Sequence, residues 1–378
     1  MPKTTGIVWT AMSRLIRCGL SQIRPPPCVL NARVSGKLES VKILIISDGI
    51  PGHVNRAKGV AQLIASHIEP SEICVLEVKL IHKWLRPLLK IVLNNQSPMA
   101  STLISFAYKI DSITHVADFD LLISAGGNTS FLNAELGARE GIKNLFMGSL
   151  RNLSADLFSA VLTLEPIHSG NDIVMNCPPS LTTYEKTHQA AMEYRRHHDM
   201  GEKPLWLMII GGNGAGCRFT LRDWIALAEG MHRLAERYQI TWLLTTSRRT
   251  GLRNEAELKR LIPPTILLNA VWYNHKPEKV MQAYLGLAEN VFCTIDSMSM
   301  ITEAISSCVK TNSLAPKIAD LDARDQDAMD KFSTMKLLQK VKLDDLSNYA
   351  YPENELDLKS LVESHYQKLA ADIKNILV

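Results

Sequence analysis

Apolar and polar positions follow a repeating order along most of this chain. Short apolar runs rich in β-branched residues, such as Val41–Ser47, are each followed by a longer stretch with apolar residues at helical spacing, such as residues 55–68. Further strands are expected at residues 73–78, 121–124, 145–148 and 160–163, and further helices at residues 79–94 and from Ser130 onward. Repeated strand–helix units of this kind predict parallel β-sheets with helices on both faces.

The rhythm is interrupted at residues 167–203, where only a helix at residues 184–197 is expected. A second series then begins, with strands expected at residues 205–210, 240–245, 265–268 and 290–295 and a helix at 221–238. The fold class we expect is therefore α/β, with two doubly wound parallel-sheet (Rossmann-like) domains facing a cleft. The expected domains are residues 40–170 and 204–345, joined by a linker at 171–203. Residues 346–378 are expected to form a helix that packs back onto the first domain.

Residues 1–39 stand apart from this pattern as a basic extension, which we expect to be flexible. The first 38 residues contain six Lys or Arg and no Asp or Glu, with three consecutive prolines at 25–27. An acid-poor, basic segment is typical of a targeting peptide, of a disordered extension or of a start codon assigned too early, and a surface anchor is a further alternative.

Composition narrows the class of protein without naming a function. The 378 residues are 46% hydrophobic and 21% charged, and no apolar run approaches the length of about 20 residues that a membrane span needs. The net charge of +4 is too mild to indicate a nucleic-acid partner. Seven cysteines without a CxxC pair indicate reduced thiols in a cytoplasmic protein, and no cluster of His, Cys, Asp or Glu has the spacing of a metal site.

Turns rich in glycine or hydroxyl residues follow several of the expected strands. In open α/β sheets, ligands bind outside the carboxyl ends of the strands, where helix N-termini offer free N–H groups to anions. Neither "GGNGAG" nor the first turn matches the P-loop or the dinucleotide fingerprint, which disfavours a P-loop NTPase and a dinucleotide oxidoreductase. The candidate acceptor-side residues in the first half are Gly49, Gly52, Gly126, Gly127 and Asn128.

The second half suits a nucleotide diphosphate, with backbone N–H groups and arginines for phosphate and a carboxylate for ribose hydroxyls. The candidate nucleotide-sugar-binding residues are Gly211, Gly212, Asn213, Gly214, Ser247, Arg248, Arg249, Asp296, Ser297, Ser299 and Glu303. Each feature also has a purely structural interpretation. Ser299, Thr302 and Glu303 would cap a helix, and the two arginines would form a solvated pair.

His53 is the candidate catalytic base, because a histidine at the end of the first strand would face the cleft and take a proton from an acceptor hydroxyl. Asp48 is the alternative base.

A basic stretch, "KLIHKWLRPLLKIV", begins at Lys79. Four cations fall at helical spacing around a tryptophan, as on helices that lie on membrane surfaces, although a core helix with a solvated cationic face has the same pattern. The candidate membrane-surface residues are Lys79, Lys83, Trp84, Arg86 and Lys90.

The order of "SDGIPGHVNRAKGVAQLI", "LLISAGGNTS", "LMIIGGNGAGCRFT", "LLTTSRRT" and "AYLGLAENVFCTIDSMSMITEA" resembles the mitochondrial-fission, or elongated-mitochondria, family. The bacterial members of that family are described as glycosyltransferases, and the resemblance implies a two-domain GT-B fold. The turns also resemble, more distantly, those of the enzyme that adds N-acetylglucosamine to a lipid-linked muramoyl-peptide, at His53, Gly211 to Asn213 and Glu303. The segment "HKPEKVMQAY" departs from the Glu-Asn-Pro-Tyr stretch usual in the family.

The resemblance implies a metal-independent enzyme without a cofactor, which transfers a sugar from a nucleotide-sugar to a saccharide or lipid-linked acceptor of the cell envelope, such as a lipopolysaccharide core. Such an enzyme would be cytoplasmic and would contact the inner face of the membrane peripherally. Plant members of the family imply an alternative, a non-catalytic adaptor that recruits a protein partner to a membrane. A nucleotide-sugar epimerase is a third candidate, and the missing dinucleotide fingerprint counts against it.

Overall fold

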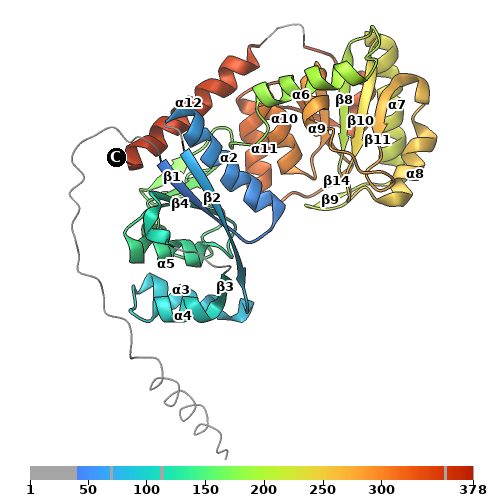
Figure 1. Ribbon diagram of the computed structural model, residues 1–378. Helices are drawn as coiled ribbons and strands as arrows, with labels where there is room; N and C mark the ends of the chain where they lie inside the picture. The colour runs from blue at the N-terminus through green and yellow to red at the C-terminus, as the bar shows by residue number, and fades with distance from the viewer. Residues whose placement is uncertain (1–40, 69–70, 111–114, 353–355, 378) are drawn as a thin grey trace, which may run out of the picture. The chain divides into compact units, whose positions relative to one another are not determined.

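The computed structural model describes residues 41–68, 71–110, 115–352 and 356–377, which all belong to one compact unit, Glu39–Val378. The basic extension expected at residues 1–39 therefore lies outside the described residues. The expected α/β fold is confirmed by two large sheets, one of seven strands and one of six, with helices packed against them (Figure 1).

The first sheet is parallel except at one edge, where β2 and β3 pair antiparallel. Its strand order places β1 beside both β2 and β4, so consecutive units are wound in opposite directions from β1. In spatial order the strands are β3 (Tyr108–Ile110), β2 (Ser71–Leu80), β1 (Val41–Ser47), β4 (Leu121–Ala125), β5 (Lys143–Met147), β6 (Ala160–Thr163) and β7 (Asp172–Val174). β7 lies inside the segment expected to be a linker, so this sheet extends further along the chain than the polar composition there indicated.

Alternation along β1 supplies both faces of the first sheet. Ile43 and Ile45 belong to one buried apolar cluster together with residues of α2 (Pro51–His67), whereas Leu44 and Ile46 belong to another. The second cluster is shared with α3 (Arg86–Asn94), α4 (Ala100–Ala107) and α5 (Ser130–Glu140). A strand buried on both faces explains why the sequence shows a continuous apolar run instead of alternation.

The second sheet is entirely parallel and repeats the same winding around β8. In spatial order its strands are β11 (Leu267–Val271), β10 (Thr241–Thr246), β8 (Leu205–Ile210), β12 (Asn290–Thr294), β13 (Lys310–Ala315) and β15 (Gln339–Lys342). A small antiparallel pair, β9 (Cys217–Arg218) with β14 (Ile318–Ala319), links two loops beside it. The remaining helices are α6 (Tyr184–His197), α7 (Leu221–Tyr238), α8 (Gly251–Leu261), α9 (Met281–Leu287), α10 (Met298–Ser306), α11 (Ala323–Thr334) and α12 (Leu358–Leu377).

The C-terminal helix α12 packs against α2. Tyr366, Leu369 and Ile373 of α12 are buried, whereas Leu356, which lies before the helix, is exposed. His67 at the end of α2 places its Nε2 3.0 Å from Glu363 of α12. The contact fixes the last helix against the first one.

Two expected helix boundaries are wrong, and each observed helix has a proline in its first turn. α2 begins at Pro51, four residues before the expected start, because proline is favoured in the first turn, where no N–H is needed. The expected helix at residues 79–94 is instead the end of β2, the 3₁₀ turn η1 (Lys83–Leu85) and α3, with Pro87 in the first turn of α3. The four cations therefore do not form one helical stripe.

Candidate active site

The winding of each sheet reverses at one pair of neighbouring strands. In the first sheet this switch point lies between β1 and β4, and in the second between β8 and β12. The predicted site residues follow the carboxyl ends of these four strands, with one further group after β10. Ligands of doubly wound folds bind at such switch points, so the sheet topology places the predicted residues where a ligand is expected.

Asp48 and His53 form a pair at the first switch point. Nδ1 of His53 lies 3.1 Å from both carboxylate oxygens of Asp48, whose side chain is only 5% exposed. Gly49 adopts a φ of +73°, and this left-handed turn brings the chain from β1 into α2 within four residues. With Nδ1 occupied by the carboxylate, Nε2 is the nitrogen left to receive a proton from a ligand.

Gly126 lets the imidazole of His53 lie directly against the turn after β4. A Cβ atom on Gly126 would stand 2.2 Å from Nδ1 of His53, and the φ of Gly126 is +88°. Its N–H donates to the carbonyl of Met147 at 3.0 Å, which ties the turn to β5. Only glycine fits at this position. Gly126, which the sequence suggested as an acceptor-side residue, forms the surface on which the ring of His53 packs.

The structure places Arg86 beside Asn128 and not on a surface with the other cations, which corrects its assignment to the membrane-facing group. Its Nη2 donates to Oδ1 of Asn128 at 2.5 Å, and the arginine is partly buried. The hydroxyl of Tyr108 donates to the carbonyl of Asn128. Burial raises the pKa of Tyr108, so the phenol remains a hydrogen-bond donor. Because residues 79–94 do not form one continuous helix, Arg86 lies at the start of α3 and contacts the turn after β4.

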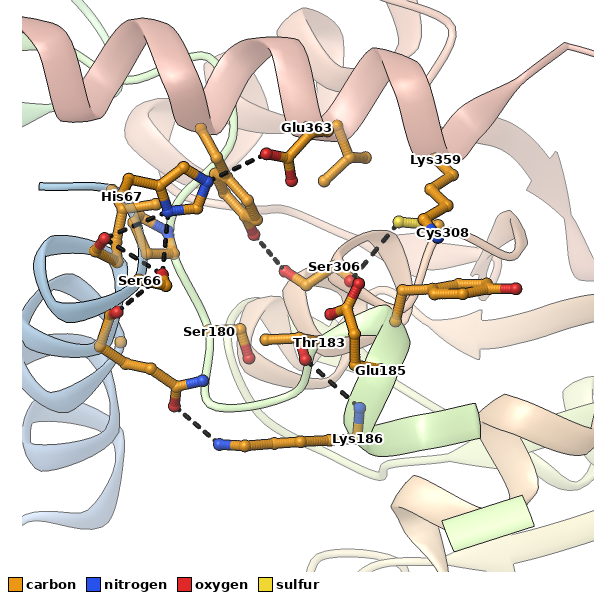
Figure 2. Close-up of a pocket in the computed structure, with 17 residues that line it drawn as sticks. Ser66, His67, Ser180, Thr183, Glu185, Lys186, Ser306, Cys308, Lys359 and Glu363 are labelled. Atoms are coloured by element: carbon orange, nitrogen blue, oxygen red, sulfur yellow. Dashed lines mark hydrogen bonds and ion pairs between the residues drawn. The ribbon is translucent and has the colours of Figure 1, made fainter. Parts of the chain in front are cut away.

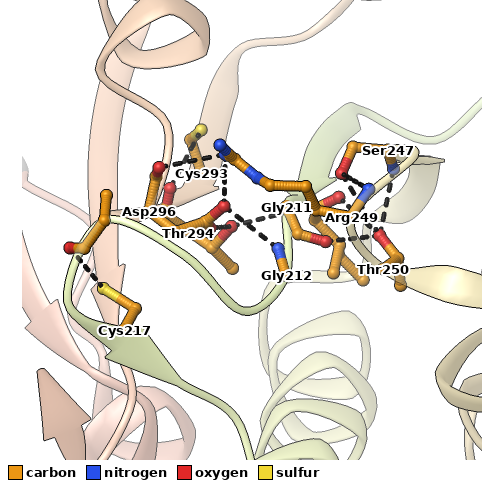
Figure 3. A network of polar contacts seen from close by, with 11 residues as sticks. Gly211, Gly212, Cys217, Ser247, Arg249, Thr250, Cys293, Thr294 and Asp296 are labelled. Carbon is orange, nitrogen blue, oxygen red and sulfur yellow. Dashed lines mark hydrogen bonds and ion pairs between the residues drawn. The ribbon is translucent and has the colours of Figure 1, made fainter.

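At the second switch point the turn after β8 is held by a buried network (Figure 3). The N–H of Gly211 donates to Oγ1 of Thr294 at 2.7 Å, and the N–H of Gly212 donates to Oδ2 of Asp296 at 3.0 Å. Asp296 is fully buried; burial raises its pKa, while the hydrogen bond from Thr294 and the charge of Arg249 oppose that rise. Arg249 donates through Nη2 to Oδ2 of Asp296 at 2.5 Å.

The network changes the roles that the sequence suggested for the glycine turn. The N–H of Gly214 donates to the carbonyl of Cys217 at 3.0 Å, so three of the four turn N–H groups bond within the protein. Oδ1 of Asn213 accepts from the N–H of Phe219 at 2.7 Å. The turn is therefore a rigid wall, and Asp296 orients Arg249 rather than facing a ligand itself.

The residues that remain free to bind a ligand lie after β10 and in α10. Arg248 is exposed and has no hydrogen bond or ion pair among the described residues. Ser297, the N-cap of α10, makes no side-chain capping bond, and Ser299 lies inside the helix and not at its cap, so the first N–H groups of α10 stay available. Glu303 also lacks a partner among the residues described, and burial raises its pKa.

The two switch points approach one another through their helix N-termini. A Cβ atom on Gly52 in the first turn of α2 would lie 4.0 Å from Oγ of Ser299 in the first turn of α10. His53 follows Gly52 directly, and Glu303 is four residues beyond Ser299. One ligand can therefore touch groups from both sheets.

Arg151, which the sequence pattern did not single out, lies in the loop after β5. A Cβ atom on Gly127 would stand 2.5 Å from Nε of Arg151, so the guanidinium lies against the backbone of that turn. The segment "GSLRN" carried the signal, an arginine just after an expected strand, the same rule that selected Arg248.

A separate cavity of about 450 Å³ lies among α2, α6 and α12 (Figure 2). Its lining includes His67, Lys186 and Glu363 and contains none of the predicted site residues. Lys186 donates to Oε1 of Gln62 at 2.7 Å and to the carbonyl of Leu181 at 3.1 Å, so its ammonium is already satisfied.

Within the described residues, no group of three or more His, Cys, Asp or Glu is arranged to hold a metal ion. None of the helices described there is long and apolar enough to cross a membrane.

Comparison with known proteins identifies a family and a fold. The family model described as "Mitochondrial fission ELM1" matches residues 51–357. The glycotransferase of kitacinnamycin is 10% identical over 90% of this chain and 99% of its own, with a TM-score of 0.51. ADP-heptose lps heptosyltransferase II of E. coli is 11% identical over 89% of this chain and 98% of its own, with a TM-score of 0.44. No curated protein matches the chain.

Proposed function

Since the chain belongs to the Mitochondrial fission ELM1 family, as the resemblance in its motifs indicated, we propose that it is a glycosyltransferase of the GT-B type. The proposed reaction transfers a sugar from a nucleotide-sugar to the hydroxyl of a saccharide or lipid-linked acceptor. The observation that carries the proposal is the approach of the first turn of α2, which holds His53, to the first turn of α10, the helix that holds Glu303.

The base in this reaction is His53. Nε2 takes the proton of the acceptor hydroxyl, and the acceptor oxygen forms a bond to the anomeric carbon as the bond from that carbon to the diphosphate oxygen breaks. Asp48 holds the imidazole in place and stabilises its positive charge, which makes Asp48 a positioning residue and not the alternative base.

The leaving nucleoside diphosphate gains negative charge in this step. The free N–H groups at the start of α10 and the guanidinium of Arg248 are available to stabilise it. The carboxylate of Glu303 would accept hydrogen bonds from the ribose hydroxyls. This scheme needs no metal ion, because fixed dipoles and arginine meet the developing charge.

We place the acceptor at a membrane, in keeping with an enzyme on the cytoplasmic side that builds a cell-envelope glycoconjugate. The segment between Ile81 and Ile110 exposes an unusual number of large apolar side chains: Ile81, Trp84, Leu88, Ile91, Met99, Phe106 and Ile110. Trp84 is 72% and Phe106 is 70% exposed. The same segment contains Lys83, Lys90 and Lys109 and no acid, which suits anionic lipid head groups.

A thermal-shift panel with UDP, GDP, ADP, CMP and their sugars tests the proposal on the full chain. We expect one nucleotide series to raise the melting temperature of the wild type and to lose this effect in Glu303→Ala. A flat response in the wild type would contradict the proposal and favour the adaptor, whose test is then a search for a protein partner.

A further inference from the structure

Two arginines that the proposed reaction does not use contact neighbouring residues of the turn after β4. Arg86 bonds to the side chain of Asn128, and Arg151 lies against Gly127. The ring of His53 packs against Gly126, the residue before Gly127 in the same turn. Two positive charges therefore stand beside the base, in the half of the site that would receive the acceptor.

Arg86 has a donor that the protein leaves unused. Its Nε is buried and has no hydrogen-bond partner, although Nη2 is bonded to Asn128. Oδ1 of Asn128 accepts from Nη2 of Arg86, and its backbone carbonyl accepts from the hydroxyl of Tyr108, so neither oxygen is bonded to Nε. A buried donor without an acceptor is unfavourable, so an oxyanion beside Arg86 would stabilise the site.

The backbone at Arg151 is fixed in an uncommon conformation. Arg151 and Asn152 both adopt positive φ angles, +52° and +66°, in the region that side chains other than glycine enter at a cost of about 1 kcal/mol. Asn94 of α3 fixes the loop by donating to the carbonyl of Asn152 at 3.0 Å and accepting from the N–H of Ser154 at 2.9 Å. The guanidinium of Arg151 itself has no partner among the described residues.

The start of α5 adds to this positive field. The helix is 11 residues long, begins at Ser130 directly after the turn and has no acid in its first turn. Asp48, whose charge acts on the nearby Tyr108, is engaged by His53. An anion placed here would meet arginine side chains and helix N–H groups together.

We propose that Arg86, Arg151 and the N-terminus of α5 bind a phosphoryl group of the acceptor. The acceptor is thus a phosphorylated compound, and its anchored phosphate positions the attacking hydroxyl next to Nε2 of His53. This inference rests on the proposed glycosyl transfer for its functional meaning, while the binding site itself can be tested without turnover.

The test is a titration of the full chain with inorganic pyrophosphate at constant ionic strength, followed by calorimetry. We expect Arg151→Gln to weaken binding about tenfold, which corresponds to about 1.4 kcal/mol. Arg86→Gln should weaken it similarly. Arg233→Gln, the same change at an exposed arginine in the last turns of α7, should leave binding unchanged. Circular dichroism checks that each variant is folded.

Pyrophosphate can also bind at the second sheet, and Arg248→Gln separates the two sites. Binding that depends on Arg151 and persists in Arg248→Gln supports the proposal. Binding that is equal in Arg151→Gln and the wild type overturns it. A flat nucleotide panel combined with binding that depends on Arg151 would refute the transferase and keep the anion site, so the two failures are distinguishable.

Discussion

Nδ1 of His53 lies 3.1 Å from both carboxylate oxygens of Asp48, on the floor formed by Gly126. The pair is built from two positions five residues apart, which the turn at Gly49 folds together. A histidine oriented by a buried carboxylate suits a general base, and this role of His53 can be tested in several independent ways.

Substitution of His53, the proposed base, should remove turnover and preserve donor binding. We expect His53→Ala to lower kcat by about 10²- to 10⁴-fold, because the acceptor hydroxyl loses its proton acceptor. Asp48→Ala should have a smaller effect, since the imidazole remains and its Nε2 can still accept the proton. Steady-state rates and nucleotide affinity of each variant check this, and wild-type turnover in His53→Ala would show that another group is the base.

The packing of the His53 ring on Gly126 predicts different effects of alanine substitution at two glycines. Gly126→Ala should displace His53 and abolish activity, because its Cβ would stand 2.2 Å from Nδ1. Gly141→Ala also has a positive φ, +65°, but a Cβ there meets nothing within 4 Å. It should cost about 1 kcal/mol of stability and keep full turnover. Equal activity losses in the two variants would contradict the role of Gly126.

The buried network at the second switch point predicts a large loss of stability. Asp296→Ala would strip partners from Arg249, Thr294 and the N–H of Gly212, and we expect it to lower the free energy of unfolding by about 3 kcal/mol. Glu257→Ala, which breaks an exposed pair with Arg260, should change it by less than about 1 kcal/mol. Urea denaturation measures both, and similar values would show that the network is not buried as described.

The raised pKa of Glu303, caused by burial, predicts a pH-dependent donor affinity. Only the ionised carboxylate accepts two ribose hydroxyls, so affinity should fall as the pH is lowered from neutral through the raised pKa. In the protein without ligand, the free energy of unfolding depends on pH in the opposite direction. The folded state holds this proton more tightly than the unfolded chain, so the free energy of unfolding should fall as pH rises from the ordinary glutamate pKa of about 4.3 through the raised value.

Glu303→Gln is the matched variant for this test. It should flatten both pH dependences, which calorimetric titration with the nucleotide and denaturation at a series of pH values would measure. A donor affinity that keeps its full pH dependence in Glu303→Gln would assign the effect to another group.

The exposed apolar segment predicts membrane binding. We expect the double variant Trp84→Ser/Phe106→Ser to lose about tenfold in affinity for vesicles that contain anionic lipid, because two aromatic side chains no longer leave water. Leu252→Ser, at an exposed leucine of α8, is the control and should bind as the wild type does. Co-sedimentation gives the bound fraction, and no binding by the wild type would exclude a membrane role.

Local chemistry determined much of the fold from the sequence. The spans of α6 and α7 match the prediction, and each begins after a threonine whose hydroxyl caps the helix, Thr183 and Thr220. Buried strands such as β1 and β8 were recognisable because apolar runs bounded by turns permit few alternatives. The glycine and hydroxyl turns of the site were recognisable for the same reason, since they follow those strands.

Tertiary structure decided what each of those residues does. Lys79 lies in a strand because β2 finds a partner in β3, a pairing that the sequence does not show locally. Arg86 joins Asn128, and Arg151 joins Gly127, across intervals of 42 and 24 residues, because neighbouring strands carry their loops to one edge of the sheet. The sequence suggested Asp296 as a ligand-binding acid, whereas the structure buries it in bonds to Gly212, Arg249 and Thr294. A pattern of residue types reports local conformation, whereas contacts between distant segments depend on how the sheets are wound.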